Sequence, residues 1–105
     1  MAEYELKVIP SSTKPNGEVT VVIGYLADQD EISANDYHLA VYKELRGGRL
    51  GKRQWKAEGT IEGEGWIVRD YFDAPSQPGK YRIVARWTLD GETLAQLDTG
   101  LSVRD

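Results

Sequence analysis

The sequence of 105 residues predicts a single all-β domain, a sandwich of seven antiparallel strands connected in Greek-key order. Three observations predict this fold. Apolar residues alternate with polar residues in many short segments, as they do on strands whose successive side chains point to opposite faces. Stretches rich in Gly, Pro, Asn and Asp separate these segments at the spacing of sandwich turns. No segment shows the apolar period of an amphipathic helix.

The clearest strand pair lies in the last third of the sequence. Every second residue from Tyr81 to Leu89 is apolar, and the residues between them are mostly polar, which predicts a half-buried strand. Asp90 and Gly91 follow, and because both tolerate positive φ they predict the two-residue type I′ turn of a β-hairpin. The returning strand is expected over residues 93–97. The apolar phase then slips, so we expect a β-bulge at Gly100.

The segment from Pro78 to Trp87 has the pattern Pro-Gly-Lys-Tyr-x-x-x-Ala-x-Trp. This pattern resembles the penultimate strand of many bacterial immunoglobulin-like domains of the E-set and fibronectin-like kind. The resemblance implies an immunoglobulin-like sandwich in which Tyr81 forms a tyrosine corner. It also implies an accessory domain of a larger bacterial surface, secreted or assembly protein. The chain has no cysteine, so it departs from antibody domains, which carry a disulfide between their sheets.

The first three strands precede a basic, glycine-rich loop. The first is expected over residues 4–8, and Pro10 ends this edge strand because proline cannot donate to a ladder. The second, over residues 18–26, is the most apolar segment and is expected at the centre of a sheet. The third is expected over residues 37–45. The loops between them are residues 11–17, with a Pro-Asn-Gly turn, and the acidic segment 27–36.

Two further strands lead to the hairpin described above. The fourth, over residues 53–61, is a weaker pattern around Trp55. The fifth is expected over residues 66–72, with Trp66, Val68 and Phe72 pointing inward. The intervening loops are residues 46–52, 62–65 and 73–79.

The composition excludes several classes of function. Lys and Arg total 13 against 17 Asp and Glu, and the resulting net charge of −4 disfavours binding to nucleic acid. The absence of cysteine excludes thiol catalysis and thiolate metal sites. No apolar run approaches about 18 residues, so we expect no contact with a membrane through a spanning helix. We therefore expect neither a nucleic-acid nor a membrane partner.

The location of the protein stays open at this level. The N-terminal residues 1–9 carry Glu3, Glu5 and Lys7 where a signal peptide needs an apolar core, so we expect no signal peptide in this chain. The protein is expected to be secreted or at the cell surface if the chain is a module of a larger protein, and cytoplasmic otherwise.

The predicted topology separates the charged loops into two ends. Loops that follow the second, fourth and sixth strands share one end of a Greek-key sandwich, and those that follow the first, third and fifth share the other. The first end would carry Asp28, Asp30, Glu31, Asp36, Glu62, Glu64, Asp90 and Glu92. The second end would carry Lys14, Arg46, Arg49, Lys52, Arg53 and Lys80.

Three interpretations of the acidic end compete. The acidic side chains could simply keep the surface solvated. They could bind Ca²⁺, which takes six to eight oxygen ligands, with Asp28, Asp30, Asp36 and Asp90 as the ligands. They could also contact a protein, including the basic end of a second copy in head-to-tail self-association. No other cofactor is expected.

The function that we expect is a non-catalytic protein-interaction module that presents loops or edge strands to a protein partner. The expected contact residues are Glu31, Ser33, Asn35, Arg46, Arg49, Arg53 and Trp55. One alternative is a small immunoglobulin-like protease inhibitor that inserts the tip loop 27–36 into a protease cleft. The other is a carbohydrate-binding module in which an outward-facing Trp55, with Tyr42 and less so Tyr71, stacks on sugar rings.

Catalytic chemistry finds little support in the sequence. His38 is the one histidine, and a Ser-His-Asp arrangement would need Ser33 and Asp36 from the same short segment, without a nucleophile-elbow motif. The basic loop RGGRLGKR lacks the Gly-Lys-Ser/Thr ending of a phosphate-binding loop. We therefore expect that the protein is not an enzyme.

Overall fold

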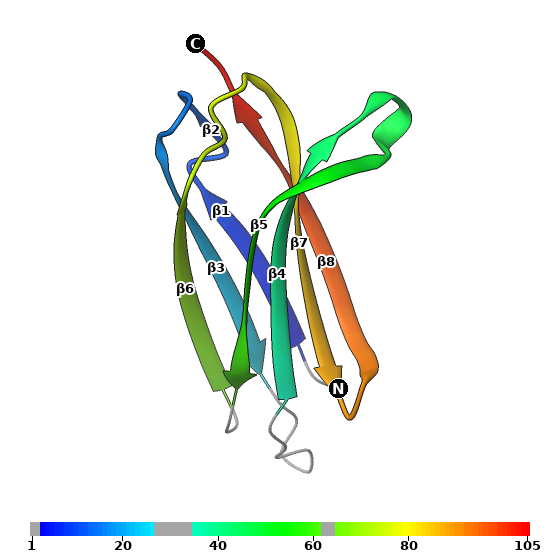
Figure 1. The fold of residues 1–105 in the computed structure, drawn as a ribbon. Coiled ribbons are helices and arrows are strands. Elements are labelled where there is room, and N and C mark those ends of the chain that lie inside the picture. Colours follow the sequence, from blue (N-terminus) through cyan, green and yellow to red (C-terminus); the bar gives the residue numbers. More distant parts are fainter. Residues whose placement is uncertain (1–2, 27–34, 62–64) are drawn as a thin grey trace.

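A computed structural model describes residues 3–26, 35–61 and 65–105, which form two facing β-sheets (Figure 1). The three-stranded sheet has the order β1 (Glu3–Ile9), β3 (Glu18–Leu26), β6 (Gly65–Asp73). The five-stranded sheet has the order β2 (Ser12–Thr13), β8 (Glu92–Val103), β7 (Gly79–Leu89), β4 (Asn35–Glu44), β5 (Leu50–Ile61). All neighbouring strands are antiparallel except β2 and β8. The prediction of an all-β fold with two sheets is confirmed.

Among the residues with described structure, one short helix interrupts the strands. The 3₁₀ helix η1 (Arg46–Gly48) lies between β4 and β5. Within the described ranges, no helix has the length and apolar character needed to cross a membrane.

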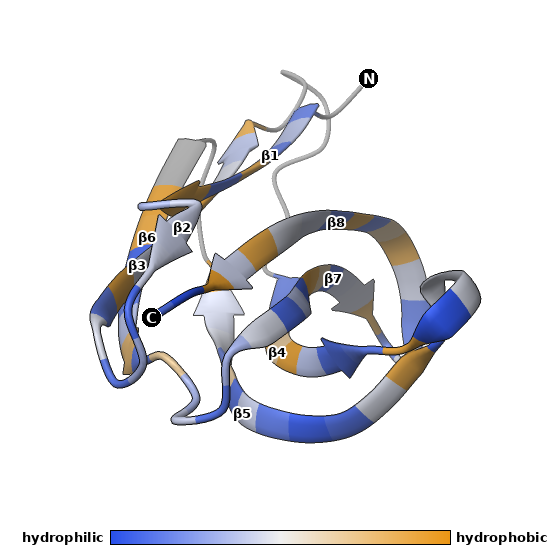
Figure 2. Ribbon diagram, turned by 90° about the horizontal axis from the view of Figure 1, so that it is seen from above, coloured by the Kyte–Doolittle hydropathy of each residue, from blue (hydrophilic) through white to orange (hydrophobic). Residues whose placement is uncertain are grey.

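The core lies between the two sheets and is built by the alternation that the sequence shows. Along β3 and β7 the side chains are buried at every second position (Figure 2 shows hydrophobic and hydrophilic residues following one another along the strands). Because successive side chains point to opposite faces, each strand gives one row to the core and one to solvent. The rows from these two strands are Val19, Val21, Ile23, Tyr25, Tyr81, Ile83, Ala85 and Trp87.

The loop before β7 is fixed by a tyrosine. The ring of Tyr81 is 2% exposed, and its hydroxyl group donates a hydrogen bond of 2.6 Å to the backbone oxygen of Gln77. The loop that precedes the strand is thereby tied to the strand itself, four residues upstream.

The predicted hairpin after β7 is confirmed. Leu89 pairs with Glu92, so two residues form the turn, and their φ values of 52° for Asp90 and 84° for Gly91 are both positive. Positive φ at both central positions defines the type I′ turn, whose twist suits antiparallel strands.

The predicted bulge at Gly100 is wrong. The pairing of β7 with β8 continues without a register shift from Ala95 to Val103, and the one shift lies where Thr88 pairs with Thr93. The extra residue is Leu94, which is 43% exposed. Thr99 occupies the inward-facing position between Leu97 and Leu101. The apolar alternation in the sequence is therefore interrupted there, although the strand continues without a bulge.

The described residues form eight strands, one more than the seven predicted from the sequence. Residues Ser12 and Thr13, expected in a loop, run parallel to β8 as β2. The backbone N–H of Ser102 donates to the oxygen of Ser11 at 2.9 Å, and that of Arg104 donates to Thr13 at 2.9 Å. This short strand satisfies edge groups of β8 that would otherwise be free to pair with another chain.

We expect Gly91→Ala to lower the free energy of unfolding by about 1 kcal/mol, because an L-residue is disfavoured at positive φ. A Cβ at Gly91 would meet no atom within 4 Å, so the loss would report conformation and not a clash. Gly100→Ala is the matched control, since its Cβ also meets nothing and its φ is ordinary. Thermal or urea unfolding of both variants measures this, and equal losses would contradict the interpretation.

Candidate partner-binding surfaces

Pairing of the strands collects several acidic residues at one end of the sandwich. Glu3 at the start of β1 pairs with the last residue of β3, and Asp36 at the start of β4 pairs with Thr88. The hairpin residues Asp90 and Glu92 lie at this same end of the strands (Figure 1). The other acidic residues predicted here, Asp28, Asp30, Glu31, Glu62 and Glu64, lie outside the described residues.

The calcium site stays a prediction. Two of its four expected ligands, Asp28 and Asp30, lie outside the described residues. Asp36 accepts a hydrogen bond of 2.9 Å from the hydroxyl group of Thr60, and Asp90 is exposed in the hairpin turn. In the part of the chain that the structure describes, no three His, Asp or Glu side chains are grouped so as to hold a metal ion.

Asn35, predicted to contact a partner, is buried in the structure. Asn35 begins β4 on the inward phase and is only 2% exposed, so its side chain faces the core. Its amide group has no hydrogen-bond partner within the described residues. Glu31 and Ser33, its expected neighbours in a protease-inhibiting loop, lie outside them.

The hairpin between β4 and β5 carries the other predicted contact residues. We define the basic arm as residues 45–53, which project away from the sandwich around η1 (Figure 1). Its charged residues are Arg46, Arg49, Lys52 and Arg53, and it contains no carboxylate. All four are exposed, and none of their charged groups forms an ion pair or hydrogen bond with another described residue, although the backbone oxygen of Lys52 accepts a hydrogen bond of 3.0 Å from Nε2 of Gln54. Within the part of the chain that the structure describes, the arm is therefore a cationic surface without paired carboxylates.

The basic arm also exposes apolar side chains. Leu45 and Leu50, on either side of η1, are 41% and 47% exposed. The turn between them is ordered by hydrogen bonds, since the N–H of Leu45 donates to the oxygen of Arg49 at 2.7 Å and that of Gly48 donates to Leu45 at 3.1 Å. Leucines beside unpaired cations are typical of a contact surface with an apolar centre and a charged rim.

The base of the arm is held by contacts to β7. Arg82 donates from Nη2 and Nε to Oε1 of Glu44 at 2.7 and 3.1 Å, and this hydrogen bond is the main cause that raises the pKa of Arg82. Glu44 is the last residue of β4. The ammonium group of Lys43 lies 4.7 Å from the ring centre of Tyr81. The arm therefore starts from a fixed position on the sheet.

The outward orientation predicted for Trp55 is wrong. Its ring is half-buried between the sheets and stacks on Phe72 of β6, with ring centres 4.9 Å apart and an angle of 21°. The charged neighbours in sequence suggested an exposed strand, but the inward row of β5 runs through Trp55 to the buried Ile61. Tyr42 does lie on the outer face of the five-stranded sheet, whereas Tyr71 lies on the outer face of the other sheet.

We expect Trp55→Ala to lower the free energy of unfolding by roughly 3 kcal/mol, because it removes a ring packed between the sheets. Tyr42→Ala, on the outer face, should cost less than about 1 kcal/mol. Denaturant unfolding of both variants measures the difference. A stable Trp55→Ala variant would mean that the indole is not part of the core.

A tyrosine and a carboxylate that the sequence analysis missed face each other across the sheets. Tyr37 lies on the inward phase of β4, and its ring covers Gly59, where an added Cβ would lie 2.6 Å from ring atoms. Burial, and second the negative charge of Asp70, raise the pKa of Tyr37 above its ordinary value of 10.0. Asp70 shares the inward phase of Val68 and Phe72, so strand alternation could have identified it.

The raised pKa of Tyr37 predicts a loss of stability at alkaline pH. Below its ordinary pKa the phenol is protonated in both states. Above about pH 10 the unfolded chain ionises first, so stability falls until the pH passes the higher pKa of the folded state. Tyr37→Phe should therefore lose less stability than the wild type between about pH 9 and pH 11. The free energy of unfolding of both proteins, measured as a function of pH, tests this linkage. An equal loss of stability in the two proteins would contradict it.

His38 has two polar neighbours on the outer face of the five-stranded sheet. Its Nε2 lies 3.1 Å from Oγ1 of Thr88, and its Nδ1 lies 3.4 Å from Oε2 of Glu58. Thr88, although in the position of a nucleophile, is 7% exposed and lies in a strand paired on both sides. Backbone N–H groups committed to a ladder cannot stabilise an oxyanion. The arrangement is that of a cross-strand polar contact.

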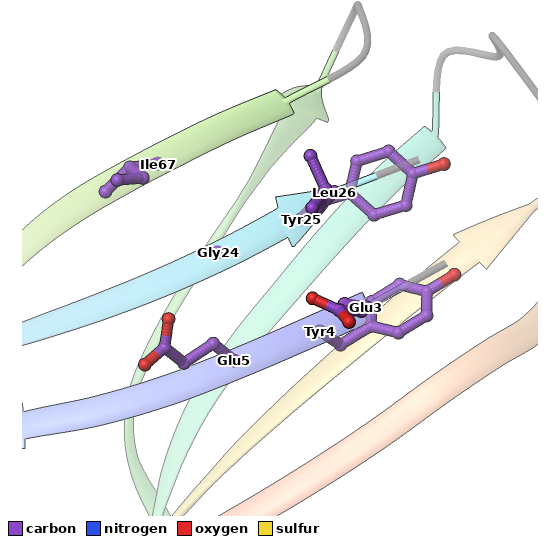
Figure 3. A pocket seen from close by; sticks show the side chains of 7 residues that line it. All are labelled: Glu3, Tyr4, Glu5, Gly24, Tyr25, Leu26 and Ile67. Carbon is purple, nitrogen blue, oxygen red and sulfur yellow. The ribbon is translucent and has the colours of Figure 1, made fainter. Parts of the chain in front are cut away.

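A hollow on the outer face of the three-stranded sheet was also missed (Figure 3). We call it the acidic hollow and define it by Glu3, Glu5, Gly24, Leu26 and Ile67. Tyr4 and Tyr25 also line it, and its volume, which is open to solvent, is about 980 Å³. It forms because Gly24 has no side chain, while its partners in the register, Glu5 on β1 and Ile67 on β6, stand on either side. No sequence motif marks it, because it depends on the pairing of distant strands.

Comparison with known proteins finds similarity only at the level of structure. No protein-family model matches the chain, and no curated protein matches it in sequence. A solved structure of the alkylpurine DNA glycosylase AlkC of Pseudomonas fluorescens, bound to DNA containing an abasic site analogue, is similar with a TM-score of 0.70 at 12% identity. The match covers 99% of this chain but 30% of that chain, so this chain spans less than a third of its length. At this identity the likeness concerns the fold alone.

Proposed function

We propose that the chain is an immunoglobulin-like, Greek-key sandwich and a non-catalytic module that binds a protein partner through the basic arm. The strand order supports the topology, since the chain passes from the three-stranded sheet to β4 and β5, back to β6, and then to β7 and β8. The hydrogen bond from Tyr81 to Gln77 has the form of a tyrosine corner. The segment around Tyr81 resembles a strand of bacterial immunoglobulin-like domains, and this resemblance supports an accessory role.

The observation that carries the proposal is the arm itself. It places four cations that have no ion-pair partner among the described residues, together with two exposed leucines, on a hairpin that projects from the five-stranded sheet, in a chain whose net charge is −4. An acidic protein surface with apolar residues at its centre fits this combination. The contact between His38 and Thr88 on the outer face favours a binding role over catalysis. The backbone N–H groups beside it are paired within the sheet, so none is free to stabilise an oxyanion.

A second candidate partner for the arm is DNA, because the similar glycosylase structure contains DNA and the arm is cationic. The sequence pI near 5.0 argues against it, since non-specific binding requires a positive field. We therefore expect no binding of duplex DNA at about 150 mM salt. Fluorescence anisotropy measures this, and salt-dependent binding that Arg46→Glu with Arg49→Glu abolishes would replace the protein partner with DNA.

Selection of a phage-displayed random-peptide library on the immobilised protein tests the proposed function. We expect enriched peptides that combine Asp or Glu with apolar residues. The double variant Arg46→Glu with Arg49→Glu should weaken their binding by about tenfold or more, since like charges then face each other.

The matched control is Lys14→Glu with Lys80→Glu, which changes the net charge equally at exposed positions outside the arm. This control should retain binding. Equal losses in both double variants, or in neither, would contradict a specific role of the arm. A glycan array run alongside should stay negative, because Trp55 is not available as a stacking platform.

A further inference from the structure

The acidic hollow and the basic arm have complementary chemistry. Leu26 and Ile67, which are 53% and 62% exposed, border the hollow on the apolar side. Glu3 and Glu5 line its other side on β1 (Figure 3). Exposed aliphatic side chains grouped around a concave site mark an interaction surface more often than a solvated one.

The arm offers the counterpart of each feature. Its two exposed leucines match the aliphatic side of the hollow, and Arg46 and Arg49 match the carboxylates of Glu3 and Glu5. Guanidinium groups form the strongest hydrogen-bonded pairs with carboxylates, often through two parallel bonds. Among the described residues, only the side chain of Glu5 comes within 4 Å of a Cβ built on Gly24, so the hollow beside it can receive an incoming side chain.

One copy of the chain cannot bring the two surfaces together. The hollow lies beside Tyr4, whose ring contacts Trp87 at 4.9 Å, and Trp87 pairs with Tyr37 near the start of β4. The arm lies beyond Glu44, at the other end of β4, in a molecule 47 Å long. Any contact between the arm and the hollow is therefore a contact between two molecules.

We infer that the partner of the basic arm is a second copy of this chain, whose acidic hollow receives Leu45, Leu50 and the guanidinium groups of Arg46 and Arg49. This inference rests on the proposed function and names its partner. The contact joins two different surfaces, so each pair leaves an arm and a hollow available, and association can continue beyond a dimer unless the geometry closes it.

One contact within the chain competes with this association. Lys7 lies 3.0 Å from Oε1 of Glu5, with both side chains more than 60% exposed. Exposed pairs of this kind are weak, so an incoming arginine can displace the lysine. This contact also provides a test. Lys7→Glu makes the protein more negative overall, which increases general repulsion between copies. It also makes the hollow more acidic, which favours binding of the basic arm.

Sedimentation equilibrium of the full chain tests the inference. The weight-average mass of the wild type should rise above 11.8 kDa with concentration, and this rise should shrink as salt screens the charges. Arg46→Glu with Arg49→Glu, and Glu3→Arg with Glu5→Arg, should each remain monomeric. An equimolar mixture of these two double variants should associate again, because each arm then meets a hollow of opposite charge.

Three further variants separate this contact from non-specific attraction. Lys14→Glu with Lys80→Glu should associate like the wild type. Lys7→Glu should associate more strongly, whereas general repulsion would weaken it. Gly24→Lys should associate about tenfold less strongly, since it fills the hollow with a cation. Its fold should be retained, because the new Cβ would meet only Glu5, at 3.4 Å.

A mass that stays at 11.8 kDa up to about 1 mM would overturn the inference. Failure of the mixed variants to associate would do the same. Peptide binding that depends on the arm, in a protein that stays monomeric, would leave the proposed function in place with a different acidic partner. Loss of both would remove the arm as a binding surface.

Discussion

The inward rows of β3 and β7 hold the two sheets against each other, and the other strands take their places around them. Val21, Ile23 and Ile83 are fully buried, and the buried ring of Trp87 packs against the ring of Tyr4. Because a strand alternates its side chains strictly, filling one face with apolar residues commits the other face to solvent. The outer faces, edges and hairpins are thus free to carry charge without cost to the core.

This division explains why the basic arm and the acidic hollow lie away from the core. The basic arm starts at Glu44, which Arg82 fixes to the sheet, and it extends into solvent where no core residue constrains its composition. The acidic hollow exists because Gly24 gives no side chain to the outer face of a strand whose inner face is fully packed. Paired strands therefore hold both surfaces in place, which would lower the entropy lost in the proposed association.

The sequence predicts most of what local chemistry decides. The turn at Asp90 and Gly91 and the buried position of Tyr81 follow from neighbouring residues alone, so both could be read from the pattern. The inward orientation of Trp55 and Asn35 could not be predicted in this way. The face to which each side chain points depends on where β5 and β4 begin to pair, and a shift of one residue reverses it. The acidic hollow depends on three strands distant in sequence, and only the fold brings them together.

The most direct test of this account is an NMR dilution series of the uniformly ¹⁵N-labelled wild-type chain, which identifies the residues in contact. The account predicts that concentration shifts two separate groups of amide signals. One group belongs to the basic arm, residues 45–53, and the other to Glu3, Glu5, Gly24, Leu26 and Ile67 of the acidic hollow. Shifts confined to other surfaces, such as the outer face around His38, or the absence of any shift, would contradict it.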